Sequence, residues 1–187
     1  NALRAEAEES ATTERLLVAY FQETVLGQKS FAAALSYTLA SKLRDDILPS
    51  ITLRDLFLEI LEEEDSLREI VRVDLQAVKD RDPAAAGYLT PFLFFKGFHA
   101  LSAYRFAHYL WFEDRKTLAL YLQSLISKVF GVDIHPAATI GRGILIDHGN
   151  GVVIGETAVL GDNVSIMQGV TLGGPGKEQG DRHPKVA

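Results

Sequence analysis

The chain has 187 residues, of which 47% are hydrophobic and 24% charged, and its formal net charge is −6 at pH 7. This length allows one large domain or two small ones, and the composition is that of a globular protein. The acidic balance argues against a nucleic-acid partner, and no apolar run is long enough for a membrane partner. The absence of cysteine excludes disulfides, thiolate metal ligands and a cysteine nucleophile. It favours a cytoplasmic location, and the polar first residues predict no signal peptide.

The first two thirds of the chain carry apolar residues at helical spacing. We expect Thr12 or Thr13 to cap a first helix and Ser30 to cap a second, because their side-chain oxygens can accept from free backbone N–H groups. The pattern breaks at Asp82, directly before Pro83. We expect Asp82 to be extended and to cap a new turn of helix there, with Pro83 at its first position.

Residues 90–111 are rich in aromatic side chains, which at helical spacing indicate a buried core or a subunit interface. His99 and His108 lie in or next to this stretch, and we interpret them as core or interface histidines. A last helix is expected from about Arg115 to Phe130, where Gly131 stops it. The connection that follows is short, so this helix should pack directly on the next part of the chain.

After residue 131 the aliphatic residues recur every six positions, apart from one step of eight. The recurring residues are Ile134, Ile140, Ile146, Ile154, Leu160, Ile166 and Leu172. A period of six fits neither an amphipathic helix nor an alternating strand, and it is typical of a hexapeptide β-helix. Four of these residues precede a glycine, and glycine suits a corner because it tolerates positive φ and has no Cβ. These glycines are Gly141, Gly155, Gly161 and Gly173.

The sequence therefore predicts an α+β fold, with an all-helical N-terminal domain over residues 1–131 and a parallel β-helix over residues 132–187. Two departures from the repeat stand out. Asp147 and His148 follow Ile146 at a corner, and after Leu172 the next register residue is Val186, fourteen positions on. Eight extra residues are thus looped out of the coil, and such loops on a rigid scaffold usually carry binding and chemistry.

His148 is our candidate general base, because imidazole titrates near neutrality and can take a proton from an alcohol. A corner histidine that only bonds nearby backbone is the alternative. Asp133 lies fifteen residues earlier, almost one coil of eighteen residues beneath His148, where a carboxylate can orient the imidazole. Its alternative role is a cap at the start of the first coil. On the long loop, Arg182 suits a carboxylate ligand, and its alternative is an ion pair with Asp181.

Three histidines of the solenoid raise a zinc hypothesis, since zinc needs converging ligands. His135, His148 and His183 are separated by thirteen and thirty-five residues, which is not a compact ligand motif, and His135 before a proline is better explained as a structural turn. The glycine-rich run before Lys177 lacks the spacing of a phosphate-binding P-loop. A weaker contact of Lys177 or Lys185 with a cofactor phosphate stays open.

Several strings of residues together resemble the serine acetyltransferase family, over nearly the whole length of the chain. In the solenoid they are Asp133-Ile134-His135-Pro136-Ala137-Ala138, Asp147-His148-Gly149-Asn150-Gly151, Gly155-Glu156-Thr157-Ala158-Val159, Val170-Thr171-Leu172-Gly173-Gly174 and Gly180-Asp181-Arg182-His183-Pro184-Lys185. In the helical half they are Ala34-Leu35-Ser36-Tyr37, Gln76-Ala77-Val78, Arg81-Asp82-Pro83-Ala84 and Lys96-Gly97-Phe98-His99-Ala100-Leu101.

This resemblance implies a left-handed β-helix that forms trimers, paired into hexamers through the helices. It implies transfer of acetyl from acetyl-CoA to the hydroxyl of L-serine, which gives O-acetylserine for cysteine biosynthesis. It implies inhibition by L-cysteine at the same site and no metal. By the same resemblance acetyl-CoA is the co-substrate, and we expect Gly174 and Lys177 to contact it.

The resemblance also implies roles for single residues. His148, oriented by Asp133, is similar to the base that deprotonates serine. Asp82 and Asp147 match the groups that hold the substrate amino group. Arg182 and His183 match the groups that meet the substrate carboxylate across a subunit boundary, and His183 is counted with the catalytic residues as well.

The chain departs from the family pattern at Ala187. The family continues with further coils, which complete the acetyl-CoA cleft, and with a tail that docks into O-acetylserine sulfhydrylase. We therefore expect a C-terminally truncated solenoid without the docking tail. Two other functions stay open on the sequence: a zinc-dependent enzyme similar to the γ-class carbonic anhydrases, and a non-catalytic assembly module.

Overall fold

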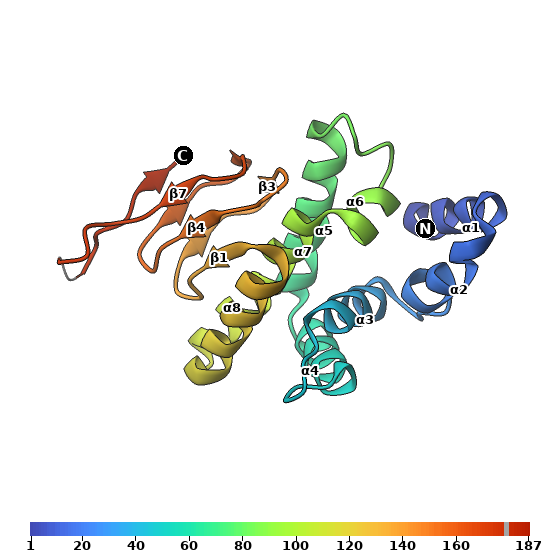
Figure 1. The fold of residues 1–187 in the computed structure, drawn as a ribbon, viewed down its shortest axis with the longest axis horizontal. Coiled ribbons are helices and arrows are strands. Elements are labelled where there is room, and N and C mark those ends of the chain that lie inside the picture. The colour runs from blue at the N-terminus through green and yellow to red at the C-terminus, as the bar shows by residue number, and fades with distance from the viewer. Residues whose placement is uncertain (178–179) are drawn as a thin grey trace.

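The computed structural model describes residues 1–177 and 180–187. Helices form one end of an elongated molecule and short parallel strands form the other (Figure 1). The helical segments are α1 (Ala2–Thr13), η1 (Arg15–Leu17), α2 (Val18–Phe21), η2 (Gln22–Leu26), α3 (Phe31–Leu43), α4 (Ser50–Glu63), α5 (Asp65–Arg81), α6 (Leu89–Phe94), α7 (Lys96–Phe112) and α8 (Lys116–Phe130). None of these described helices is both long and apolar enough to cross a membrane.

The predicted caps have different outcomes. Ser30 does cap α3, because its side chain accepts from the backbone N–H of Ala33 at 3.1 Å. The prediction for Thr12 and Thr13 was wrong, since both end α1 and their hydroxyls donate to carbonyls one turn earlier. The threonine hydroxyl has satisfied a local carbonyl instead of starting a helix.

Asp82 is extended as predicted, but the chain after it forms a single hydrogen-bonded turn that is not helical. Asp82 follows the last residue of α5, and its Oδ1 accepts from the N–H of Ala84 at 2.9 Å, while the next helix starts only at Leu89. An aspartate that bonds its own backbone two residues on forms a tight turn. The predicted side-chain contact is therefore present, but it closes a turn.

The aromatic stretch forms a buried core, as expected. α7 is buried along most of its length, and Phe106 stacks on Phe57 with ring centroids 4.4 Å apart. His99 is fully enclosed, with Nε2 2.8 Å from the carbonyl oxygen of Phe92, and burial lowers its pKa to about 3. His108 reaches across to the strand half, where its Nδ1 lies 2.7 Å from the carbonyl oxygen of Pro136.

The strands wind into a parallel β-helix with three faces. They are β1 (Val132–Ile134), β2 (Thr139–Ile140), β3 (Leu145–Ile146), β4 (Val152–Ile154), β5 (Val159–Leu160), β6 (Ser165–Ile166), β7 (Thr171–Leu172) and β8 (Lys185–Val186). The faces are the parallel sheets β1-β4-β7, β2-β5-β8 and β3-β6. The six register residues from Ile134 to Ile166 all point inward and are at most 8% exposed. The predicted hexapeptide register is confirmed.

The lengths of the coils follow the irregular steps of the repeat. Val132 pairs with Val152, twenty residues on, because the step of eight lies between them. Val153 pairs with Thr171, eighteen residues on, as in a regular coil. Leu160 pairs with Val186, twenty-six residues on, so the predicted eight-residue excursion is present.

The corner glycines were predicted for two reasons, and only one holds. None of Gly141, Gly155, Gly161 and Gly173 has a positive φ. A Cβ at Gly141 would lie 2.8 Å from the backbone nitrogen of Asp162 in the next coil, and a Cβ at Gly155 would overlap the ring of His183. At these two corners glycine is needed because neighbouring groups approach the backbone closely.

The helices and the solenoid share one continuous hydrophobic core. α8 ends at Gly131, whose φ of 69° terminates the helix, and β1 begins at the next residue. Deeper in the joint, Arg105 Nε donates to Asp74 Oδ2 at 2.6 Å, and both side chains are buried. Because the core runs across the joint, the division at residue 131 into two domains stays a prediction.

Candidate active site

The turn between β3 and β4 carries Asp147 and His148. The N–H of Asp147 is tied to the carbonyl oxygen of Ile166 in the next coil at 2.8 Å, which fixes the start of the turn. His148 has φ of 56°, a left-handed conformation, and two glycines with positive φ follow it. Its side chain is 73% exposed, and Nε2 lies 3.7 Å from Asp147 Oδ1. The imidazole is therefore open to a substrate and has a carboxylate beside it.

The start of α7 holds this turn from the helical side. A Cβ at Gly97 would overlap the carbonyl oxygen of Ile146, so helix and strand approach as closely as glycine allows. Lys96 Nζ donates to Asn150 Oδ1 within the same turn. Lys96 and Gly97 therefore hold the start of α7 against this turn.

Asp133 lies on another part of the solenoid. It sits in β1 between two buried residues and points outward, where its Oδ1 accepts from Gln123 Nε2 of α8 at 2.7 Å. It borders an open groove of about 490 Å³ between α8 and β1. Within the described part of the chain, no hydrogen bond joins Asp133 to His148.

The irregular coil explains this separation. Asp133 pairs with Val153, so His148 is five residues short of the position above Asp133 and occupies the preceding corner. The expectation that Asp133 lies almost directly beneath His148 assumed a coil of eighteen residues. The orienting role of Asp133 therefore stays a prediction.

The long loop places Arg182 and His183 at the corner between β4 and β5. It projects beyond the coils before it returns to the solenoid at β8 (Figure 1). Arg182 Nη2 lies 3.4 Å from Glu156 Oε2, and His183 Nδ1 lies 2.8 Å from Thr157 Oγ1. Sequence reasoning missed Glu156 and Thr157 as partners, and their place in the resemblance was the only signal.

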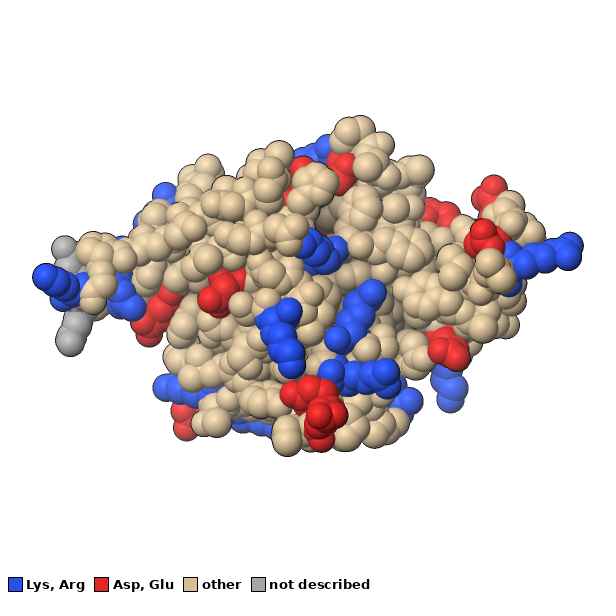
Figure 2. Space-filling model, in the orientation of Figure 1, with Lys and Arg blue, Asp and Glu red and all other residues tan. Residues whose placement is uncertain are grey.

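The alternative role for Arg182 is not realised. Asp181 pairs with Lys185 instead, and this hydrogen bond lowers the pKa of Asp181. Figure 2 shows acidic and basic side chains interspersed on this face of the molecule, with basic residues at the end of the solenoid where the loop projects. Arg182 itself pairs with Glu156 across the corner.

His135 belongs to the same corner. Burial lowers the pKa of His135. The negative charges of Glu156 and Asp133 oppose this shift, and the positive charge of Arg182 adds to it. Its Nδ1 accepts from the N–H of Ala137 at 3.1 Å. Its ring packs edge-on against the ring of Trp111, with centroids 5.0 Å apart. The interpretation of His135 as a structural turn residue is confirmed.

Asp82 is held beside the third face of the solenoid. Its neighbour Arg81 donates to the carbonyl oxygen of Asn163 at 2.7 Å and to Ser165 Oγ at 3.0 Å. These bonds dock the end of α5 against the β3-β6 sheet, the face that leads to His148.

The two residues expected at a cofactor lie in the long loop. Gly174 packs against the backbone of Arg182, so a Cβ there would overlap its carbonyl oxygen. Lys177 is exposed just before residues 178 and 179, which lie outside the described residues. The contact of Gly174 with Arg182 gives this glycine a structural role within the loop.

Two further observations bound the site. Among the described residues, no group of three or more His, Asp or Glu side chains is placed to hold a metal ion.

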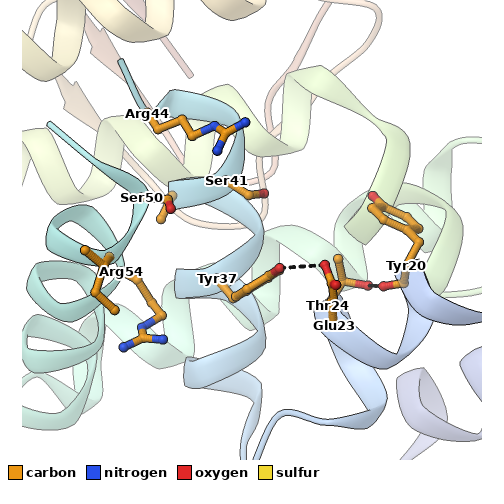
Figure 3. Close-up of a pocket in the computed structure, with 10 residues that line it drawn as sticks. Tyr20, Glu23, Thr24, Tyr37, Ser41, Arg44, Ser50 and Arg54 are labelled. Atoms are coloured by element: carbon orange, nitrogen blue, oxygen red, sulfur yellow. Dashed lines mark hydrogen bonds between the residues drawn. The ribbon is translucent and has the colours of Figure 1, made fainter. Parts of the chain in front are cut away.

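A pocket of about 360 Å³ lies in the helical half (Figure 3). Arg44 and Arg54 are among the residues that line it, and the hydroxyl of Tyr37 donates to the Glu23 carboxylate there. None of the predicted site residues lines this pocket.

Comparisons with known protein sequences give a consistent result. A family model described as "Serine acetyltransferase, N-terminal" matches residues 1–103. A serine acetyltransferase from Haemophilus influenzae is 53% identical over 98% of this chain and 69% of its own length. Serine acetyltransferase 2 from Arabidopsis thaliana is 53% identical over 100% of this chain, which spans 58% of that relative.

Comparisons with solved structures agree. Soybean serine acetyltransferase complexed with serine is 50% identical, with a TM-score of 0.96 over 98% of this chain and 76% of that one. The enzyme from Brucella abortus in complex with coenzyme A is 47% identical, with a TM-score of 0.96 over 100% of this chain and 74% of that one. A serine acetyltransferase in complex with cysteine is 52% identical, with a TM-score of 0.95 over 98% of this chain and 72% of that one.

These matches identify the parallel coils as a left-handed β-helix. They favour the serine acetyltransferase assignment over the zinc-dependent enzyme similar to the γ-class carbonic anhydrases. The helical half, the coils and the residue strings agree in one assignment. The chain belongs to the serine acetyltransferase family of acyltransferases.

Proposed function

We propose that this chain transfers acetyl from acetyl-CoA to the hydroxyl of L-serine, and that L-cysteine inhibits it by binding in the place of serine. The observation that carries the proposal is the exposed His148 imidazole, held in a left-handed turn with Asp147 Oδ1 at 3.7 Å. The serine, cysteine and coenzyme A complexes of similar proteins support the choice of ligands. O-acetylserine, the product, supplies cysteine biosynthesis, and the proposed compartment is the cytoplasm.

In the proposed mechanism, His148 takes the hydroxyl proton of serine while the hydroxyl oxygen attacks the thioester carbonyl carbon. A C–O bond forms and a tetrahedral oxyanion results. When the oxyanion collapses, the C–S bond breaks, and the imidazolium returns its proton to the leaving thiolate to give CoA. General-base help of this kind contributes about 10²–10⁴-fold.

The nearby carboxylates support a positive charge on the base. Asp147 stabilises the imidazolium that forms during attack, because an opposite charge within about 4–6 Å favours the charged form. Because Asp133 lies away from the His148 of its own chain, we propose that it orients the His148 of a neighbouring copy through its second oxygen, while Oδ1 accepts from Gln123. In that arrangement α8 contributes to the orientation of the base.

Serine is a zwitterion, so its site needs acids at one end and cations at the other. We propose that Asp82 and Asp147 hold the ammonium group and that Arg182 and His183 hold the carboxylate, with His183 next to the reacting hydroxyl. The guanidinium fork of arginine matches a carboxylate in two parallel bonds. Gly174 and Lys177 are proposed to contact acetyl-CoA.

The separation of the two corners supports a shared site. His148 and Arg182 lie on different corners of one solenoid, so we propose that the corners of neighbouring copies meet in a trimer. Val153 and Met167 are exposed on the outside of the coils and suit such an interface. Leu16 and Phe94, exposed on the helical half, suit a second interface that pairs trimers into hexamers.

The test combines binding with turnover. We expect calorimetry to show binding of L-serine, L-cysteine and acetyl-CoA, with cysteine displacing serine, and we expect CoA release to require serine. Arg182→Lys keeps the charge but loses the fork, so it should raise KM for serine far more than it changes KM for acetyl-CoA. Binding of none of the three ligands would contradict the proposal and favour the assembly module.

A further inference from the structure

Thr157 lies outside the long loop and contacts both Arg182 and His183 within it. Its Oγ1 accepts from the backbone N–H of Arg182 at 3.1 Å and of His183 at 3.2 Å. Its Oγ1 also lies 2.8 Å from His183 Nδ1, and its own N–H donates to that nitrogen at 3.2 Å. Four contacts of one residue therefore tie down the two loop residues that are proposed to bind the substrate carboxylate.

Both acceptor sites of the Thr157 hydroxyl are used by these contacts. A threonine hydroxyl has two acceptor lone pairs and one proton. The two backbone N–H groups of the loop occupy the lone pairs, so the hydroxyl can act only as a donor toward His183 Nδ1, and the Asp181 carboxylate is a second acceptor for the same proton. Valine has nearly the same shape but would leave both loop N–H groups without this acceptor.

The same contacts select one tautomer of His183. A backbone N–H can only donate, so the contact from the N–H of Thr157 requires His183 Nδ1 to accept. In a neutral imidazole the other nitrogen then carries the hydrogen. His183 is therefore held with Nε2–H as its only ring donor.

The neighbours of Thr157 complete the arrangement. Gly155 leaves room for the His183 ring, which lies where a Cβ would be. Glu156 holds the guanidinium of Arg182 at 3.4 Å, and Lys185 Nζ donates to the carbonyl oxygen of Thr157. One short turn, residues 155–157, thus positions the guanidinium of Arg182, the ammonium of Lys185 and the ring of His183.

We propose that Thr157 is a positioning residue, which acts through Arg182 and His183. Its hydroxyl fixes the backbone of both residues, and its N–H and hydroxyl hold His183 as an Nε2–H donor for an anionic oxygen of the substrate. This inference rests on the proposed function, because it assigns Thr157 to the carboxylate end of the same site.

The first test is Thr157→Val, compared with Thr157→Ser. We expect Thr157→Val to raise KM for serine about tenfold, because loss of a net hydrogen bond is worth about that factor, while kcat changes much less. Thr157→Ser retains the hydroxyl and should restore KM. Thr139→Val, an exposed threonine on the neighbouring strand β2, should leave both constants unchanged.

The second test does not depend on turnover. In Thr157→Val we expect faster amide hydrogen exchange at Arg182 and His183, with Thr157→Ser and Thr139→Val close to wild type. Nitrogen NMR of the wild-type His183 ring should show the hydrogen on Nε2.

The outcomes separate this inference from the proposed function. If wild type turns over serine and Thr157→Val keeps wild-type KM and exchange rates, the positioning role is overturned and the function stands. If wild type neither binds nor acetylates serine, the function fails, while exchange and the ring tautomer still decide whether Thr157 sets the loop. An Nδ1–H tautomer of His183 would overturn the inference in either case.

Discussion

His148 is built into the solenoid at a cost in backbone energy. Its φ of 56° is left-handed, and this conformation costs about 1–2 kcal/mol for most L residues, with histidine, asparagine and aspartate tolerating it better. Asp114 and Asn163 are the other described non-glycine residues with positive φ, and both have side chains of the tolerant kind. A strained residue with an exposed imidazole is what we expect where chemistry, rather than stability, has selected the side chain.

His148→Asn tests this separation of activity from stability. Asparagine adopts the left-handed region readily, so the thermal midpoint should stay the same or rise slightly. Acetyl transfer should fall by about 10²–10⁴-fold, because the base is lost. Steady-state kinetics and thermal unfolding measure the two effects.

Asp114→Asn is the matched control, because Asp114 also has a positive φ and lies on the α7–α8 turn. It should change neither turnover nor midpoint. Near-normal turnover in His148→Asn would exclude His148 as the base.

At the scale of elements, α7 determines where the turn that carries His148 lies. Gly97 is the second residue of this helix, and its hydrogen faces the carbonyl oxygen of Ile146 at the end of β3. The next two residues after Ile146 are Asp147 and His148. A shift of α7 against β3 would therefore move the proposed base.

Gly97→Ala sets two effects against each other. Helix propensity alone favours alanine by about 0.8–1.0 kcal/mol. The new Cβ would overlap the Ile146 carbonyl, and overpacking of this kind costs about 1–3 kcal/mol. We expect the packing effect to win, so denaturant unfolding should show lower stability and assays should show lower turnover.

Gly176→Ala offers the control for added bulk, since a Cβ at Gly176 meets no described atom within 4 Å. Its stability should match wild type. A stabilised and fully active Gly97→Ala would mean that the helix and the strand are not in contact as described.

At the scale of the whole molecule, one buried ion pair joins the helices to the solenoid. Asp74 comes from α5 and Arg105 from α7, and Arg105 Nη2 also donates to the carbonyl oxygen of Gly141 at 2.7 Å. Asp74 Oδ1 accepts from the N–H of Ile144 at 3.0 Å. Burial raises the pKa of Asp74, and Arg105 counters that rise.

Asp74→Asn should be strongly destabilising. The amide oxygen can still accept from Ile144, but the buried guanidinium loses its counter-charge, and breaking such a pair costs about 3–5 kcal/mol. Denaturant unfolding at one fixed protein concentration measures the loss, because assembly would otherwise shift the midpoint.

Asp80→Asn changes an exposed carboxylate on the same helix, and surface changes of this kind stay within about 0.5 kcal/mol. Replacing both members of the pair, as in Asp74→Leu with Arg105→Met, should recover only part of the stability, because it removes the unpaired charge but leaves the N–H of Ile144 and the carbonyl oxygen of Gly141 without these partners. Equal stability of Asp74→Asn and Asp80→Asn would show that the pair does not hold the two halves together.

The sequence by itself determined the features that depend on local pattern. The six-residue register from Ile134 to Val186, the eight-residue excursion, the cap at Ser30 and the helix end at Gly131 follow from which side chains must be buried and which φ values glycine allows. The residue strings carried the family as well, because they extend over nearly the whole chain.

Only the tertiary structure decided which groups meet. The step of eight residues is visible in the sequence, but only the structure shows that Asp133 accepts from Gln123 of α8 and that no hydrogen bond of the described residues joins it to His148. Thr157 and Glu156 gained their roles because the long loop folds back over the corner that they occupy. Burial is periodic along a chain and can be read from its order, whereas partners across corners depend on how coils stack and helices pack against them.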